Sequence, residues 1–130
     1  MRVVFDTNIF ISAFIIPGSQ AEKAMLKIIE GEDSLVISKE IIHEVLSILS
    51  SKFSRDGEAL GHVAVTLSEI AELVHPIKRI RIFKDEPDNR VLECALIGKA
   101  EAIVTGDKEM LKLKEYRGIR IISLREYLEL

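Results

Sequence analysis

Short apolar runs separated by longer stretches of helical spacing predict an alternation of strands and helices. Runs rich in β-branched residues at Val3–Phe5, Leu35–Ile37 and Ala102–Thr105 are typical of buried strands. Ile119–Ile122 is a further candidate strand. In Ile77–Phe83, basic and apolar residues alternate, which predicts a strand with one solvent-facing side.

Apolar residues at helical spacing lie between these strands. They predict helices over Ala21–Glu30, Ser38–Phe53, Leu60–Val74, Asp85–Gly98 and Met110–Leu113, and a last helix capped by Ser123. Strands that alternate with helices favour right-handed crossovers and a mostly parallel sheet covered on both faces. We therefore expect one three-layer α/β/α domain over residues 1–130, with no internal repeat and no linker.

Composition narrows the class of protein. The chain is 48% hydrophobic and 30% charged, which excludes intrinsic disorder. No apolar run approaches the roughly 18–20 residues that a membrane-spanning helix needs, so we expect a cytoplasmic protein without a membrane partner. The single cysteine, Cys94, excludes both an internal disulfide and a cysteine-based zinc site, and it is expected to be a buried apolar residue.

Acidic residues stand where two predicted strands end. Asp6 follows the first strand directly, and Asp107 comes just after Ala102–Thr105. If these strands are neighbours, both carboxylates project from the same edge of the sheet, where open parallel sheets bind ligands. Each aspartate taken alone is better explained as a helix N-cap.

Two further acids come from predicted helices. Glu44 lies beside the border of the apolar stripe of its helix, from which it can reach a cleft, although an exposed position on the helix flank explains it too. Asp88 lies on the sheet-facing side of its helix, in the first turn, where the helix dipole favours an acid. Glu93 lies well around the same helix and is expected at the surface.

These four acids gain chemical meaning if they converge. Four carboxylates in one cleft repel one another, so a cation is expected among them. Oxygen ligands without thiolates or a histidine pair favour one or two Mg²⁺ or Mn²⁺ ions, which activate water for displacement at a phosphodiester. Asn8 and Thr105 supply supporting polar groups on the same edge.

Four segments of the chain, in this order, resemble the motifs of one family. They are Val3–Asn8, Ser38–Glu44, Asp85–Ala95 and Ile103–Asp107. Together they are similar to the PIN-domain ribonucleases, and in particular to the small prokaryotic members related to VapC-type toxins. The resemblance implies a central sheet of five parallel strands and a divalent-metal site made by Asp6, Glu44, Asp88 and Asp107, with Asn8 and Thr105 in support. Asp85 is an additional acid beside Asp88.

The resemblance implies a metal-dependent endoribonuclease, the toxin component of a toxin–antitoxin system, with RNA as substrate and an antitoxin protein as candidate partner. The alternatives are a PIN-fold module that binds RNA or protein, and an RNA-processing nuclease without a toxin role. A dehalogenase-type phosphatase is disfavoured because it needs a second aspartate where this chain has Asn8. A phosphoacceptor domain is disfavoured because Asp6 stands alone after the first strand.

Two features of the sequence concern binding partners. Arg79 and Arg81, with the neighbouring lysines, could contact RNA phosphates or could protect an edge strand from aggregation. The long apolar stripe of Leu60–Val74 suggests a homodimer interface, although packing in the core also explains it.

The net charge of −3, from 21 acidic and 18 basic residues, argues mildly against a nucleic-acid binder. Setting aside the four proposed metal ligands leaves 17 acidic residues against 18 basic ones, so the excess of negative charge is local to the predicted site.

Overall fold

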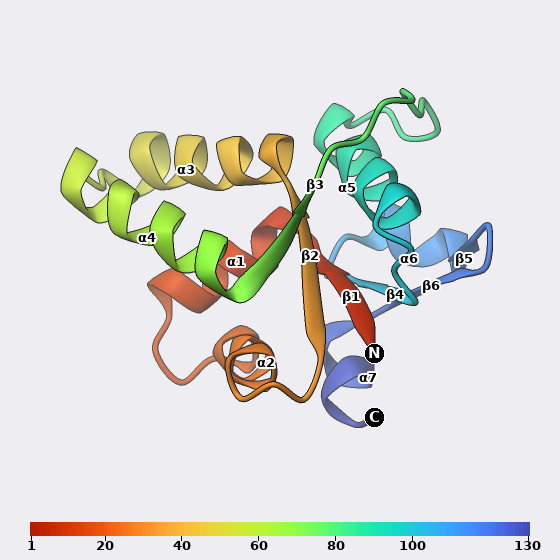
Figure 1. Cartoon of the computed structure of the whole chain (residues 1–130), viewed down its shortest axis with the longest axis horizontal. Helices are drawn as coiled ribbons and strands as arrows, with labels where there is room; N and C mark the ends of the chain where they lie inside the picture. Colours follow the sequence, from red (N-terminus) through yellow and green to blue (C-terminus); the bar gives the residue numbers. More distant parts are fainter.

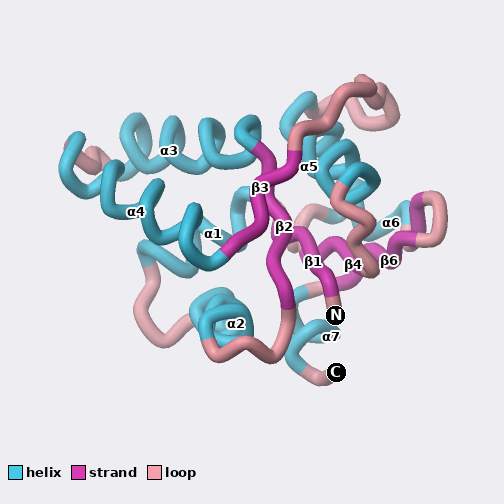
Figure 2. Tube along the Cα trace, viewed as in Figure 1, coloured by secondary structure: helices cyan, strands magenta, loops and turns pink.

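A twisted sheet runs through the middle of the molecule, with helices on both faces (Figures 1 and 2). The computed structural model describes all 130 residues. The strand order is β3-β2-β1-β4-β6-β5. The strands are β1 (Arg2–Phe5), β2 (Ser34–Ser38), β3 (Ala71–Val74), β4 (Ala102–Val104), β5 (Glu115–Tyr116) and β6 (Ile119–Ile122). All neighbouring strands are parallel except β5 and β6, which form an antiparallel pair.

Seven helices connect and cover these strands. They are α1 (Thr7–Ile15), α2 (Gln20–Ile29), α3 (Lys39–Phe53), α4 (Gly57–Ile70), α5 (Glu86–Ile97), α6 (Lys108–Leu113) and α7 (Leu124–Leu128). Helix α5 packs on β1, β2 and β4, while α1 contacts α2 and α3, and α2 contacts α7. The three-layer α/β/α architecture with a mostly parallel sheet is therefore confirmed.

The core is centred on β1 and β4. Phe5 is fully buried and packs on Phe10 of α1 and Tyr127 of α7, with ring centroids 5.7 Å and 5.6 Å away. On the other side of the sheet, α5 buries Val91 and Leu92 completely. Helices on both faces explain why the central strands are apolar throughout rather than alternating.

Local sequence signals set several helix boundaries. The Ser38 side chain accepts a hydrogen bond from the Ile41 N–H and begins α3, as predicted. Ser123 and Glu126 form a reciprocal capping box that begins α7. Asp85 is the N-cap of α5, and Gly98 ends that helix. The predicted helix positions are thus confirmed where a cap marks the boundary.

The prediction for residues 60–83 is wrong in two respects. Helix α4 ends at Ile70, and the following residues, Ala71–Val74, form β3 instead of a last helical turn. The segment Ile77–Phe83 is a loop, not a strand. Its apolar residues do not share a buried face, since Ile77 is 88% exposed and Ile82 48% exposed. Residues 71–74 have apolar residues at helical spacing, but they form a strand because they pair in parallel with β2.

Besides β3, two elements were not predicted. Helix α1 follows Asp6 immediately, and its residues Ile9, Phe10 and Ile11 are all buried, so the segment shows no amphipathic period. Strand β5 has only two residues and adds a sixth strand to the five parallel ones that were expected. No helix combines the length and the apolar character that crossing a membrane requires.

Candidate active site

The first acidic residue of the site is held by the edge of the sheet where β1 and β4 end. Phe5 and Val104 are partners in the parallel register, and the Asp6 N–H donates to the Val104 carbonyl at 2.9 Å. The buried Thr105 hydroxyl donates to Asp6 Oδ2 at 2.7 Å. Asp6, itself only 4% exposed, is therefore fixed in orientation by Thr105, the residue that follows β4.

Asp107 is held by the same threonine from the other side. Its backbone N–H donates to Thr105 Oγ1 at 3.0 Å. Asp107 Oδ1 accepts from the N–H groups of Glu109 and Met110, at 2.8 Å and 3.0 Å, and so caps α6. The expected N-cap role is confirmed, and it uses only Oδ1, which leaves Oδ2 without a protein donor.

Asp88 projects from the first turn of α5 toward these residues. It is 5% exposed, and its carboxylate makes no hydrogen bond. Burial raises the pKa of Asp88 to about 7, and the negative charges of Asp107, Asp6 and Asp85 add to the rise. Burial also raises the pKa of Asp6, although the bonds from Thr105 and from the Thr7 backbone oppose that rise. The two groups thus lie in a cleft where added positive charge is favourable.

Asp85, Asp88 and Asp107 form the tightest group of acids. One carboxylate oxygen from each lies within 4.8 Å of the others. Asp85 is exposed and its side chain does not cap α5, so its oxygens are free. A group made only of carboxylate oxygens fits a hard divalent cation such as Mg²⁺ or Mn²⁺. Asp6 adds its charge to this group, since it contributes to the raised pKa of Asp88.

Glu44 lies beside this group rather than within it. It is half-buried on α3 and lines a cavity of about 140 Å³ together with Thr7, Glu40, Glu86 and Arg90. Thr7 follows Asp6 directly, so the cavity adjoins the acidic site. Of the four predicted ligands, the structure gathers Asp6, Asp88 and Asp107 with the additional Asp85, and places Glu44 in the neighbouring cavity.

The acidic residues open onto a second cavity of about 450 Å³. Its lining consists of Ile82, Phe83, Lys84, Asp85, Asp88, Asp107 and Glu109. One wall therefore comes from the loop before α5, and the other from α5 and α6. The cavity combines a cationic side chain, Lys84, with four carboxylates, so it can accommodate a phosphate and a cation together.

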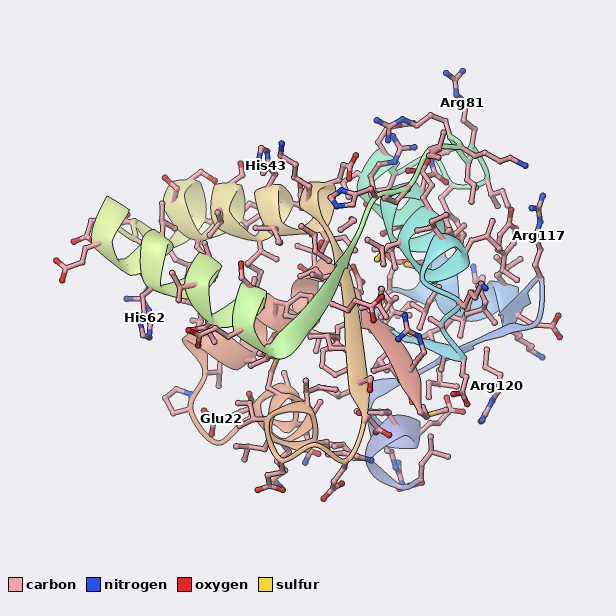
Figure 3. The ribbon with its side chains drawn as sticks, in the orientation of Figure 1. Glu22, His43, His62, Arg81, Arg117 and Arg120 are labelled. Atoms are coloured by element: carbon pink, nitrogen blue, oxygen red, sulfur yellow. The ribbon has the colours of Figure 1, made fainter.

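The remaining predicted residues have distinct surroundings. Asn8 is exposed in the first turn of α1, whereas Thr105 is fully buried between two acids. Arg79 is half-exposed and pairs with Glu93 at 3.2 Å and with Glu40 at 3.9 Å. Arg81 makes no ion pair and points away from the molecule (Figure 3). Because both arginines lie in a loop, protection of an edge strand no longer explains them.

Two residues of α5 differ in how well the sequence predicts their burial. Cys94 is buried as expected, and burial raises the pKa of its thiol to about 12, which excludes a thiolate nucleophile at neutral pH. Glu93 was expected at the surface and is only 3% exposed. That expectation is wrong because the 75–85 loop, His75–Asp85, folds over this side of α5 and supplies partners for the carboxylate.

The sequence and the fold now identify the class of protein. Residues 2–109 match the model of the PIN domain family. An uncharacterized protein of Methanocaldococcus jannaschii, MJ1680, is 31% identical over 119 residues, which cover 88% of this chain and 76% of that protein. The chain belongs to the PIN domain family.

Two solved structures share the fold. One is of VapBC2 from Rickettsia felis bound to a promoter DNA fragment, with a TM-score of 0.67, 14% identity, and coverage of 95% of this chain and 98% of the matched chain. The other is of VapBC-1 from nontypeable Haemophilus influenzae, with a TM-score of 0.64, 19% identity, and coverage of 96% and 99%. The resemblance inferred from the four segments is thereby confirmed at the level of family and fold.

Proposed function

We propose that this protein is a divalent-metal-dependent endoribonuclease. The observation that supports the proposal is the group of Asp6, Asp85, Asp88 and Asp107, in which burial and mutual repulsion raise the pKa of Asp88 to about 7. A bound Mg²⁺ or Mn²⁺, one ion or two, would supply Lewis-acid activation of water and of a phosphate oxygen. Asp88 and Asp107, with Asp85, would hold the cation at the cavity.

Other residues would orient this arrangement. Asp6 has one oxygen bonded to Thr105, so Thr105 would fix the direction in which the carboxylate faces the cation. Glu44, from the adjoining cavity, is proposed as a fifth acid, which would act at the border of the site. Asn8, exposed beside Asp6 and Thr7, would contact the substrate rather than the cation.

The test is cleavage of single-stranded RNA in Mg²⁺ by the Asp6→Asn variant. We expect a loss of at least about a hundredfold in kcat/KM, since the substitution removes a charge from the group that would bind the cation. The matched control is Asp56→Asn, which removes the same charge from the exposed N-cap of α4, where asparagine caps equally well. Unchanged cleavage by Asp6→Asn would contradict the assigned metal site.

Calorimetry separates the enzyme from a binding module. A nuclease of this kind should bind Mg²⁺ or Mn²⁺ in the absence of RNA, and Asp88→Asn should abolish that binding. If the wild-type protein binds RNA but no divalent ion, the PIN-fold binding module becomes the better proposal.

Arg79 and Arg81 are proposed RNA contacts of unequal importance. Arg79 is engaged by Glu93 and Glu40, whereas Arg81 is free, so Arg81→Ala should weaken RNA binding more than Arg79→Ala. The slope of log affinity against log salt concentration should fall by about 0.7 for each phosphate that the variant no longer neutralises. Equal binding by both variants and wild type would remove this loop from the RNA interface.

We further propose that the nuclease serves as the toxin of a toxin–antitoxin pair, with an antitoxin protein as partner. The support is the shared fold with chains from two VapBC complexes. Growth arrest on expression, relieved by a protein encoded next to this gene, is expected. Normal growth would favour an RNA-processing nuclease without a toxin role.

A homodimer is proposed on different grounds from those expected. The apolar stripe of α4 is used by the core, where Val63 and Leu67 are buried. Large exposed apolar side chains remain on α4, β3 and the loop that follows, at Val65, Leu73 and Ile77. Light scattering at micromolar concentration should give twice the chain mass, and Ile77→Ser should lower it; a monomeric wild type contradicts the dimer.

A further inference from the structure

The 75–85 loop has almost no backbone support of its own. It lies outside every helix and strand, and no backbone group between Pro76 and Lys84 makes a hydrogen bond to another backbone group. A segment of this kind would be mobile unless side chains hold it. The structure supplies such side chains from α5.

Asn89 replaces the missing backbone partners at one end of the loop. Its Oδ1 accepts from the N–H groups of Ile82 and Phe83, at 3.1 Å and 2.9 Å. Its Nδ2 donates to the Phe83 carbonyl at 2.8 Å. One amide side chain thus satisfies three backbone groups, much as a neighbouring strand would.

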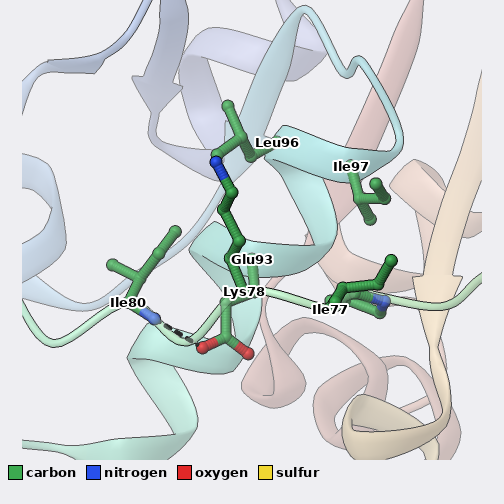
Figure 4. A pocket seen from close by; sticks show the side chains of 7 residues that line it. Ile77, Lys78, Ile80, Glu93, Leu96 and Ile97 are labelled. Atoms are coloured by element: carbon green, nitrogen blue, oxygen red, sulfur yellow. Dashed lines mark hydrogen bonds between the residues drawn. The ribbon is translucent and has the colours of Figure 1, made fainter.

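Glu93 holds the middle of the loop, one helical turn further along α5. Its Oε2 accepts from the Ile80 N–H at 2.8 Å, a bond seen at close range in Figure 4. Arg79 and Arg90 pair with the same carboxylate at 3.2 Å and 3.0 Å, and Arg90 also donates to the Ile80 carbonyl at 3.2 Å. These donors offset the cost of burying the charge of Glu93.

The loop held in this way forms one wall of the acidic cavity. Ile82, Phe83, Lys84 and Asp85 line it together with Asp88, Asp107 and Glu109. Three cations of the loop, Lys78, Arg81 and Lys84, take part in none of the ion pairs of the structure, so their charges are available to an anion. Asn89 and Glu93 are both almost completely buried, at 0% and 3% exposure, so their part is to support the loop rather than to touch a ligand.

We propose that Asn89 and Glu93 are positioning residues that fix the 75–85 loop as the phosphate-binding wall of the site. This inference rests on the proposed ribonuclease function. Two buried side chains of α5 would therefore determine RNA affinity, whereas the acidic residues would carry the chemistry. Loss of Asn89 or Glu93 should therefore act on KM more than on kcat.

The first experiment follows the loop without any RNA. Amide hydrogen exchange of the wild-type chain should show slow exchange at Ile80, Ile82 and Phe83. Asn89→Ala should accelerate exchange at Ile82 and Phe83 while the sheet stays protected. Glu93→Gln keeps an acceptor for the Ile80 N–H but loses its charge. It should therefore accelerate exchange at Ile80 less than Asn89→Ala accelerates exchange at Ile82 and Phe83. Unchanged exchange at Ile82 and Phe83 in Asn89→Ala would overturn the clamp.

The second experiment measures cleavage of single-stranded RNA in Mg²⁺ at several salt concentrations. Asn89→Ala should raise KM by about five- to tenfold with kcat within about twofold, and should flatten the salt dependence. The matched control is Tyr127→Phe, which removes a 2.7 Å hydrogen bond to Asp33 far from the loop. It should lower the melting temperature without changing KM.

The outcomes distinguish the two proposals. If the wild-type chain neither cleaves nor binds RNA, the proposed function fails, while the exchange data still decide whether the clamp exists. If the wild type cleaves RNA and Asn89→Ala has the KM and salt dependence of Tyr127→Phe, the positioning role alone is overturned.

Discussion

Replacing Asp88 by asparagine should stabilise the metal-free protein, and more so at alkaline pH. In the unfolded chain this carboxyl ionises near 3.8, whereas in the folded chain burial and three neighbouring acids raise its pKa to about 7. The folded state therefore binds the proton more tightly. The stability that this group contributes is full below pH 3.8 and is lost progressively as the pH rises toward 7.

The size of the effect follows from the two pKa values. A tenfold difference in proton affinity between the folded and unfolded states corresponds to about 1.36 kcal/mol, so raising the pH from about 5 to about 8 should increase the cost of the Asp88 carboxyl to the folded state by about 3 kcal/mol. Asparagine does not ionise. The difference in unfolding free energy between Asp88→Asn and wild type should therefore grow by about 3 kcal/mol over that range.

Urea unfolding in the presence of a chelator measures this difference directly. A second arm adds Mg²⁺ at the higher pH, where the wild type should gain stability and Asp88→Asn should gain little, because the cation binds only the folded wild-type site. A difference between variant and wild type that stays constant from about pH 5 to about pH 8 would refute the charged, buried environment assigned to Asp88.

Two further substitutions test the surroundings of the site. Gly98→Ala should destabilise the chain by about 1–3 kcal/mol in urea unfolding, because the added Cβ would lie 2.5 Å from Val36 Cγ1 and 2.9 Å from the Cys94 carbonyl oxygen. An unchanged unfolding midpoint would show that α5 can shift away from β2. Thr105→Val should lower the free energy of unfolding by about 1–3 kcal/mol and kcat about tenfold, since it removes the donor to Asp6 and leaves the Asp107 N–H unpaired. A variant with wild-type kcat would show that Asp6 needs no orientation by this hydroxyl.

The positions of two strands and of two acids follow from local sequence. Strands β1 and β4 are short β-branched runs, and each ends in polar residues that include Asp6 and Asp107. Since parallel strands bring their carboxyl ends to the same edge, these acids were expected to lie close together if the two strands were neighbours, and β1 does pair with β4. Asp88 was expected to face the sheet, and it is buried there.

What sequence patterns missed depends on contacts between distant segments. Residues 71–74 continue the helical spacing of α4, and only their pairing with β2 makes them a strand. Helix α1 is buried on most of its surface, which removes the amphipathic period by which helices are recognised. Glu93 is buried because the 75–85 loop folds over it, and the spacing of apolar residues in α5 gives no sign of this contact.

The distribution of charge explains how a chain with a net charge of −3 could act on a polyanion. Asp88 and Asp107 come from α5 and from the start of α6, and the loop that begins after β3 brings Lys84, beside Asp85, to the same cavity. A phosphate approaching the acids alone would meet repulsion, whereas with a divalent cation bound it would meet positive charge from both sides. RNA affinity should therefore depend on the cation and on the clamped loop together, and removal of either should weaken binding even though the net charge of the chain barely changes.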